Sequence, residues 1–528
     1  MTKGLSFLAL GLVFLLAFGG SLDASYGLYI GKNLTADGSV MLGGTGDEVS
    51  GHWIVIVPRM EHEPGDMITV GVTEDAAMPG ELIEIPQASV TYRFIAHYYS
   101  NYEGFPPPLT NGGLNEYQVA ARDIWSPSRP ELVEMTDPVQ RGLNYSDLAR
   151  IVMERAMTAE QAVDIIGKLI DEHGFATYGG NSHLFADPRE GWVFINFAGS
   201  QGLWVAERLG PDEVRMNYPG YINAIPREHI DFANLTLKRN SEYKASANFI
   251  SFAVEQGWYD PDSRDDFDVN AIYGEGTGRD ITLFRTTGER VINPLTGEDV
   301  TNTTVAEYEE RLRDAAPVTL EDMMALVRTP LLSGDSNGYG EVAHLRSGLN
   351  NAELATIWMA ATGSVTTPFV PFYIGTETVP MEYGQHRYLY RGADATFVTK
   401  DWAIQEATDF AYRTFKQLMY FTCDHPDVFL PEVNESLIGY ERRAIAEQDT
   451  VHGTADALIQ AGHVDYAKQY LTDYTARKAD EALEMGEGLL AGVRARTEAI
   501  YGLRRPETDN VQELSYNMVN CLIFEGEE

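Results

Sequence analysis

The sequence predicts an α+β fold that ends in a helical region, and three observations support this prediction. Residues 26–97 contain short runs in which apolar residues alternate with polar residues or glycine, as in half-buried strands. Residues 147–173 carry apolar side chains at helical spacing, and the strand-like alternation returns in residues 178–208. From Asp401 onward helical spacing dominates again.

Composition excludes some function classes. The 528 residues include 78 acidic and 39 basic side chains, which leaves a formal net charge of -39. A surface of this sign repels nucleic acid, so we expect no nucleic-acid partner. Hydrophobic residues make up 44% of the chain, enough to bury a large core. The length suits one large domain with an appendage, or two to three smaller domains.

The first 24 residues have the layout of a secretory signal peptide, with a basic start, the apolar block Leu5–Phe18, and a small, polar end. The apolar block is shorter than the roughly 20 residues that a helix needs to span a bilayer. We therefore predict a secreted or extracytoplasmic protein without a stable membrane anchor. Ala24 suits the position before a cleavage site, whereas Leu22 is larger than the residue preferred two places earlier. Removal by a signal peptidase and autocatalytic removal both expose Ser25; cleavage elsewhere would leave Ser25 an ordinary strand residue.

Ser25 is the candidate nucleophile. An N-terminal serine carries its α-amine within reach of its own hydroxyl, and the reference pKa of that amine is about 7.7–8.0. The amine can therefore act as a general base near neutral pH, so that one residue supplies both nucleophile and base.

The segment after Ser25 predicts a β-hairpin, because apolar residues alternate on both sides of the turn at Asp37-Gly38. Pairing of its strands brings Gly43–Asp47 beside Ser25. Asp47 is then a candidate for orienting the α-amine, although carboxylates in glycine-rich loops are more often simply solvated. Further strands are predicted at residues 53–58, 67–72 and 89–97, and a proline-rich loop at 104–108.

Polar residues mark the ends of two later strands. Asn115 and Asp123 lie at the two ends of a short apolar strand that follows a Gly-rich turn. Residues 147–173 then form a predicted helix pair, in which Thr158 begins the second helix. Asn181 follows two glycines and starts the next strand, where its amide could be presented to a substrate oxyanion. An Asn after Gly-Gly is more often a turn residue.

The second half of the chain offers weaker signals. Residues 334–338 match G-x-S-x-G, but a nucleophile elbow needs a strand directly before it and a helix directly after it, and a surface loop fits better. The histidines are scattered without H-E-x-x-H, so a zinc peptidase is not expected. Cys423 and Cys521 show no metal-ligand spacing, and whether they form a disulfide stays open. Helices are predicted at 243–257, 305–326, 402–420, 450–462 and 464–500; those after residue 400 either cover the core or build a homo-oligomer contact.

The order of these motifs resembles the secreted dipeptidase family that includes the secernins. It is more distantly similar to the penicillin V acylases and bile salt hydrolases, all N-terminal nucleophile (Ntn) hydrolases. The resemblance runs over residues 25–225 and continues more loosely to residue 373. It rests on residues 25–39, 113–120, 179–192, 204–208 and 217–222.

The resemblance implies a four-layer αββα sandwich, a mature chain that begins at the nucleophile, and hydrolysis of an amide bond in dipeptides or short peptides without metal or cofactor. We therefore expect the Ntn-hydrolase domain at residues 25–400, followed by the helical region that the spacing predicts at 401–528. Three positions depart from the family pattern. Ser25 stands where cysteine is usual, Gly43–Asp47 lacks an arginine that relatives carry ahead of acidic residues, and Gln118 replaces a glycine.

The hypothesis is therefore a secreted Ntn dipeptidase. Ser25 attacks the scissile carbonyl, its α-amine takes the proton, Asn181 stabilises the oxyanion and Asp47 orients the ammonium form. Asn115 and Asp123 have a supporting or substrate-binding role. Two alternatives remain open: an Ntn amidase acting on another amide such as an N-acyl amino acid, and a non-catalytic ligand-binding relative.

Overall fold

The computed structural model describes residues 25–502 with internal gaps. Outside the described residues lie 1–24, 47–51, 100–103, 218–221, 239–241, 275–278, 280–281, 284–290, 330–331, 334–336, 386–408, 424 and 503–528. The predicted leader, Asp47, the proposed domain boundary at residue 400 and Cys521 therefore fall outside them, and these predictions stay untested.

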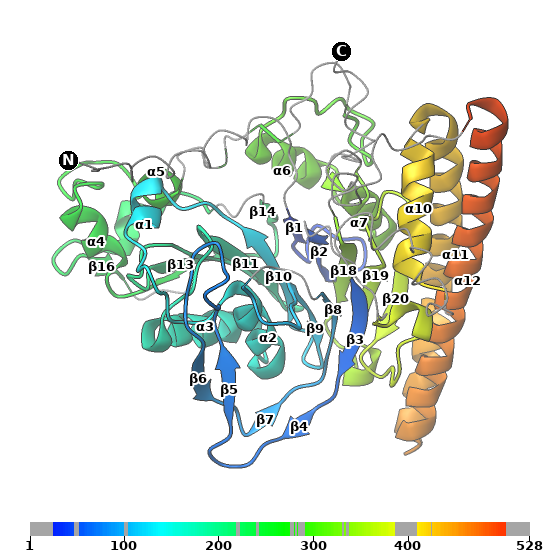
Figure 1. Ribbon diagram of the computed structural model, residues 1–528, viewed down its shortest axis with the longest axis horizontal. Helices are drawn as coiled ribbons and strands as arrows, with labels where there is room; N and C mark the ends of the chain where they lie inside the picture. Colours follow the sequence, from blue (N-terminus) through cyan, green and yellow to red (C-terminus); the bar gives the residue numbers. More distant parts are fainter. Residues whose placement is uncertain are drawn as a thin grey trace, which may run out of the picture.

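Two antiparallel sheets form the centre of the protein (Figure 1). The six-stranded sheet has the order β14-β1-β2-β18-β19-β20, and the eight-stranded sheet has the order β17-β13-β12-β11-β10-β9-β8-β3. The strands of the first are β1 (Tyr26–Ile30), β2 (Val40–Gly46), β14 (Val214–Asn217), β18 (Tyr339–Leu345), β19 (Thr356–Ala360) and β20 (Val370–Tyr373). Those of the second are β3 (Trp53–Val57), β8 (Phe94–Tyr98), β9 (Gly112–Asn115), β10 (Ala120–Trp125), β11 (Asn181–Ala186), β12 (Gly191–Asn196), β13 (Trp204–Leu209) and β17 (Tyr243–Ala245).

Three strand pairs of the described segments lie outside these sheets. They are β4 (Met60–Glu61) with β7 (Val90–Thr91), β5 (Met67–Val70) with β6 (Ile83–Pro86), and β15 (Ile230–Asp231) with β16 (Thr236–Leu237). The predicted strand at 89–97 is thus divided between β7 and β8.

The two sheets pack face to face, and helices cover their other faces. Tyr29 and Leu42 of the six-stranded sheet share one core with Ile124 and Leu184 of the eight-stranded sheet. Helices α2 (Tyr145–Arg155) and α3 (Ala159–His173) pack on the other face of the eight-stranded sheet. Helices α6 (Val305–Asp314) and α7 (Leu320–Val327) pack on the other face of the six-stranded sheet.

The predicted hairpin and helix pair are confirmed. Strands β1 and β2 pair with Tyr26 opposite Thr45, but the connection is the segment 31–39 and not a tight turn at Asp37-Gly38. The Thr158 side chain accepts a hydrogen bond from the backbone N–H of Gln161 and caps α3, which ends at Gly174 with φ +84°.

Two predicted helices are wrong in extent. Residues 243–257 divide into β17 and α4 (Phe249–Glu255), because the first three pair with β13 and extend the eight-stranded sheet. Residues 305–326 divide into α6 and α7, since Pro317 lacks the N–H that a continuous helix would need. Within the described residues, the remaining short helices are α1 (Pro130–Glu134), α5 (Val269–Tyr273) and the 3-10 turns Arg227–His229, Ala352–Leu354 and Met381–Tyr383.

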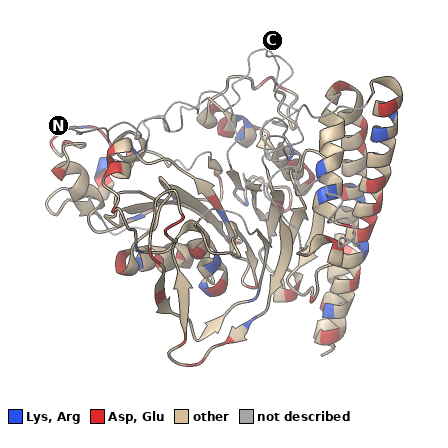
Figure 2. Ribbon diagram, in the orientation of Figure 1, with Lys and Arg blue, Asp and Glu red and all other residues tan. Residues whose placement is uncertain are grey.

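Three C-terminal helices stand beside β20 (Figure 1). They are α10 (Ala411–Cys423), α11 (Pro426–Gln460) and α12 (Val464–Ile500). The predicted helix at 464–500 is confirmed, whereas the one at 450–462 is the end of the much longer α11. Figure 2 shows acidic residues spread over helices and loops alike, in keeping with a solvated surface. Among the described helices, none has both the length and the apolar character required to cross a membrane.

Candidate active site

Ser25 directly precedes β1 and is buried, with 7% of its surface exposed. Along β1, Tyr26 and Leu28 point toward α6 and α7, whereas Gly27 and Tyr29 face the eight-stranded sheet. Because side chains alternate along a strand, Ser25 belongs to the same face as Gly27 and Tyr29. The candidate nucleophile therefore faces the space between the two sheets.

Next to Ser25, β2 presents only backbone toward that space. In the β1–β2 register Gly44 lies opposite Gly27, so Gly46 is the position across from Ser25. On the far side of β2, strand β18 places Tyr339 opposite Gly46 and Glu341 opposite Gly44. Two glycines thus lie between the candidate nucleophile and a row of polar side chains on β18.

Arg122 of β10 reaches across from the other sheet and lies over Gly44. Its Nε is 3.1 Å from the point that a Cβ at Gly44 would occupy. Its Nη2 donates a hydrogen bond to the Tyr339 hydroxyl at 2.7 Å, and its Nη1 pairs with the Glu341 carboxylate at 2.5 Å. All three side chains are buried. This ion pair links the two sheets next to the start of β1.

Two histidines complete this inter-sheet cluster. His97 Nδ1 lies 3.6 Å from Glu341 Oε2, and its ring centroid is 4.5 Å from that of Tyr339. Burial lowers the pKa of His97 to about 4, against the opposing effect of Glu341. His52 packs between Tyr99 and Tyr339. We call Arg122, Glu341, Tyr339, His97 and His52 the inter-sheet cluster.

Asn217 approaches the same space from the other side of β1. It pairs with Gly27 across β1 and β14, so it is a diagonal neighbour of Ser25 on the same face. Its Nδ2 donates to Ser182 Oγ at 3.1 Å; Ser126 Oγ also donates to Ser182 Oγ, at 2.9 Å. Within the described part of the chain, its Oδ1 has no hydrogen-bond partner. Asn217 therefore presents a buried, incompletely paired amide near the nucleophile.

A buried ion-pair network holds β14 in place. Arg215, two residues before Asn217, pairs with Glu207 of β13 at 2.8 Å and lies 3.9 Å from Glu309 of α6. The Glu309 carboxylate also accepts a hydrogen bond from the Met216 backbone N–H at 2.6 Å. The two carboxylates hold the pKa of the Arg215 guanidinium above its usual value, although burial opposes them. This network fixes the strand that carries Asn217.

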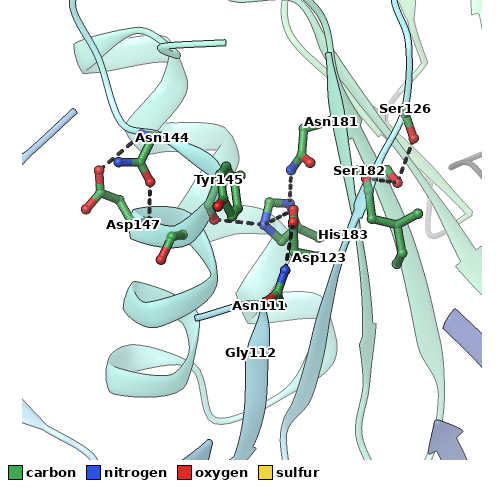
Figure 3. Close-up of polar contacts among 12 residues, drawn as sticks. Asn111, Gly112, Asp123, Ser126, Asn144, Tyr145, Asp147, Asn181, Ser182 and His183 are labelled. Atoms are coloured by element: carbon green, nitrogen blue, oxygen red, sulfur yellow. Dashed lines mark hydrogen bonds and ion pairs between the residues drawn. The ribbon is translucent and has the colours of Figure 1, made fainter. Parts of the chain in front are cut away.

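Asn181 lies on the opposite face of the eight-stranded sheet from this space. Figure 3 shows Asn181 and His183 on the side of α2, whereas Ser182, between them in sequence, points the other way toward Ser126. Asn181 Oδ1 accepts a hydrogen bond from the Tyr178 hydroxyl at 3.0 Å. The structure therefore does not bring the amide of Asn181 together with Ser25.

Asp123 belongs to that same α2-facing side. Its Oδ1 lies 3.6 Å from His183 Nε2, and its Oδ2 accepts a hydrogen bond from Asn111 Nδ2 at 3.3 Å (Figure 3). His183 Nε2 is also 3.2 Å from the backbone oxygen of Tyr145. Burial lowers the pKa of His183 to about 4. These contacts tie β10 and β11 to the start of α2 and do not reach the space that Ser25 faces.

Asn115 is occupied by the backbone. Its Nδ2 donates to the carbonyls of Met153 and Ala156, and its Oδ1 accepts from the N–H groups of Tyr117 and Val119. An amide side chain has two donors and two acceptor lone pairs, so nothing remains for a substrate. The expected substrate-binding role of Asn115 has no hydrogen-bonding group to support it.

Two departures from the family pattern have a structural counterpart. Gly44 leaves the room over β2 that Arg122 occupies. Gln118 adopts φ +59°, a left-handed conformation that favours glycine. Its side chain donates to the Arg346 carbonyl at 3.2 Å and accepts from the Arg346 N–H at 3.0 Å. These two bonds offset the strain.

Sequence reasoning missed Arg122, Glu341 and Asn217. Asn217 was within reach, because it ends an apolar strand and falls in the last stretch of the resemblance. Arg122 and Glu341 carried no motif. The G-x-S-x-G segment is followed directly by β18 and not by a helix, so it lacks the context of a nucleophile elbow. Among the described residues, no group of three or more His, Cys, Asp and Glu side chains is arranged to hold a metal ion.

Comparison with known proteins identifies the family. The model of peptidase family C69 matches residues 24–308, more than half of the chain. The chain belongs to peptidase family C69. The match begins one residue before Ser25 and includes β1, β2, β10, β11 and β14.

Curated relatives of this C69 protein carry dipeptidase names. A probable dipeptidase B of Streptococcus pyogenes is 28% identical over 216 residues, which are 40% of this chain and 39% of the relative. A probable dipeptidase of Salmonella dublin is 25% identical over 268 residues, 50% of this chain and 56% of the relative. A dipeptidase of Bifidobacterium longum is 22% identical over 410 residues, 67% of this chain and 71% of the relative. The chain thus spans 39% of the length of the first relative and more of the others.

Proposed function

We propose that this C69 protein is a secreted dipeptidase of the Ntn type, which hydrolyses dipeptides or short peptides with Ser25 as its N-terminal nucleophile. The observation that carries the proposal is the position of Ser25. It directly precedes β1, it faces the inter-sheet space, and only glycine lies across from it on β2. Removal of the leader at this point would expose an α-amine there. The dipeptidase names of the relatives support the substrate class.

The packing of the sheets supports the Ntn placement. Two antiparallel sheets share a core, with α2 and α3 against one and α6 and α7 against the other. The αββα sandwich expected of an Ntn hydrolase has the same order of layers.

In the proposed reaction, Ser25 Oγ attacks the scissile carbonyl while the α-amine, directly or through one water, accepts the hydroxyl proton. The resulting ammonium returns this proton to the leaving amine as the C–N bond breaks, which leaves an acyl ester on Ser25. Water, deprotonated by the same amine, then attacks the ester; the ammonium returns that proton to Ser25 Oγ as the C–O bond breaks and the acid is released. Asp47 is retained as the group that orients the ammonium form.

We assign the oxyanion donor to Asn217 instead of Asn181. Asn217 shares a face with Ser25, whereas the Asn181 amide lies beyond the eight-stranded sheet. One N–H of Asn217 donates to Ser182, which holds the amide in position and leaves its second N–H for the substrate. Such a donor typically contributes about 3 kcal/mol to lowering the barrier.

Secretion is part of the proposal. The predicted signal peptide supports it, and so does Cys423, which is disulfide-bonded. Disulfides persist mainly in oxidising, extracytoplasmic compartments.

The experiment that tests the proposal is terminal sequencing and intact mass of the exported protein, followed by dipeptide assays. We expect a chain that begins at Ser25 and hydrolyses free dipeptides. Ser25→Ala should abolish turnover, Ser25→Cys should retain it, and Ser89→Ala, at an exposed serine, should have no effect.

Other outcomes would point to the alternatives. Hydrolysis of N-acylated dipeptides at the same rate as free ones would favour the broader amidase. A chain that starts at Ser25 but hydrolyses neither class would favour a ligand-binding relative. Full turnover by Ser25→Ala would overturn the proposed mechanism.

A further inference from the structure

We propose that Arg122 is a positioning residue that keeps the α-amine of Ser25 uncharged near neutral pH, by holding a guanidinium beside the start of β1. This inference rests on the proposed function, because the amine exists only once Ser25 is the first residue. A residue of β10, in the opposite sheet, thus sets the pKa of the base.

The first step of the argument is proximity. A Cβ built on Gly44 would lie 2.0 Å from the Tyr26 carbonyl oxygen and 3.1 Å from Arg122 Nε. Because both atoms lie close to the same point, the guanidinium lies beside the carbonyl of Tyr26, the residue bonded to Ser25. Only glycine at position 44 leaves room for this approach. The charge of Arg122 also acts on the Tyr26 side chain, where it opposes the rise of the hydroxyl pKa that burial causes.

The second step is the direction of the ion pair. Glu341 is on β18, which is separated from β1 by β2. The Nε of Arg122 lies over β2 itself. The positive end of the pair is therefore the end nearer to Ser25. Tyr339 accepts a hydrogen bond from Nη2 and fixes the plane of the guanidinium. Because the pair is buried, solvent screens its field weakly.

The third step concerns the other titratable groups that face this space. His97 has its pKa lowered to about 4, so it is neutral near pH 7. Burial raises the pKa of the Tyr29 hydroxyl, so it is neutral as well, whereas the Tyr26 hydroxyl points away from this space and donates to the Val327 carbonyl of α7. The remaining groups on the facing elements, within the described residues, are Tyr339, His52 and Arg215, the last ion-paired with Glu207. Arg122 is thus the charge nearest to Ser25 among the described groups that face this space.

A nearby cation disfavours the ammonium form and lowers the pKa of an amine. The strand spacing puts the guanidinium about 7 Å from the α-amine and the Glu341 carboxylate about 10 Å from it. Replacing Arg122 by methionine should then raise the amine pKa by about 0.5 to 1.5 pH units, the smaller shift applying if Glu341 takes up a proton. Glu341→Gln should lower it by about one unit, because it removes the opposing charge.

The experiment is a titration of the Ser25 amine in purified protein whose first residue is Ser25. Trace acetylation with acetic anhydride at a series of pH values, read by mass spectrometry of the N-terminal peptide, gives the amine pKa without any substrate. The acidic limb of the pH profile of kcat/KM for a dipeptide gives a second value. Arg122→Lys serves as the charge-retaining control, and circular dichroism checks folding.

The proposal expects opposite shifts for Arg122→Met and Glu341→Gln and an unchanged amine pKa for Arg122→Lys. If a single variant does not fold, the double variant Arg122→Met/Glu341→Gln replaces the whole buried pair with neutral groups, and a rise of about half a unit is expected. An amine pKa that is the same in the folded Met variant and the wild type overturns the inference. Because acetylation needs no turnover, a protein without dipeptidase activity would refute the proposed function and still report on Arg122.

Discussion

The assignment of the oxyanion donor can be tested by exchanging the two asparagines separately. Asn217→Ala removes an amide on the face that Ser25 shares, and Asn181→Ala removes one on the α2 side of the eight-stranded sheet. Loss of one oxyanion donor typically lowers kcat by about 10²- to 10³-fold, equivalent to about 3–4 kcal/mol. We therefore expect this loss in Asn217→Ala, with a much smaller change in KM, and at most a threefold change in Asn181→Ala.

Each substitution also removes structural hydrogen bonds, so stability must be measured alongside. Asn217 donates one bond to Ser182, and a neutral buried hydrogen bond is worth about 1 kcal/mol. Thermal unfolding followed by circular dichroism should show both variants folded at the assay temperature. A folded Asn217→Ala that keeps a third or more of the wild-type kcat, together with a large kcat loss in Asn181→Ala, would refute the argument from strand faces.

Three further predictions concern stability. Arg215→Ala leaves the buried Glu207 carboxylate without its cation, while Glu309 keeps its ion pair with Arg279, and should lower the free energy of unfolding by about 3–5 kcal/mol in urea titrations; an unchanged midpoint would mean that the network is not formed. Gly167→Ala places a Cβ 2.6 Å from the ring of Trp204 and should lower the free energy of unfolding by about 1–3 kcal/mol. Gly488→Ala, in open space on α12, should leave that free energy unchanged or raise it. Equal effects of the two substitutions would contradict the packing. His183 has a pKa of about 4 in the folded protein, below the value of about 6.5 in the unfolded chain. Between these two pH values the unfolded chain therefore binds one proton more than the folded protein. The free energy of unfolding should fall as the pH is lowered from about 6.5 to about 4. His183→Asn should reduce that slope by up to about 1.4 kcal/mol per pH unit, and an identical slope would exclude a buried neutral histidine.

Features that depend on neighbouring residues were predictable from the sequence. The alternation on both sides of Asp37-Gly38 predicted the hairpin and placed Gly44 and Gly46 beside the start of β1, although the connection that sets the register is the longer segment 31–39. The cap at Thr158 and the stop at Gly174 placed α3, since both act within a few residues. The long helix 464–500 followed from its spacing. Where β17 pairs with β13, tertiary pairing overrode a local helical pattern.

The face that each strand residue presents was not predictable. Alternation gives a period of two but not its phase, so Asn181 and Ser182 were equally able to face the inter-sheet space. Packing of α2 on the eight-stranded sheet decided the phase and put Asn181 on the far side.

The sequence by itself determined the family, the candidate nucleophile and the strands around it, because each of these depends on residues that are close together in the chain. Only the tertiary structure decided which side chains share the inter-sheet space with Ser25. Arg122 and Glu341 are far apart in the chain and lie on different sheets, and Asn217 reaches the site through the pairing of β14 with β1. Such contacts depend on how two sheets are stacked and in what register, and no local pattern in the chain encodes that geometry.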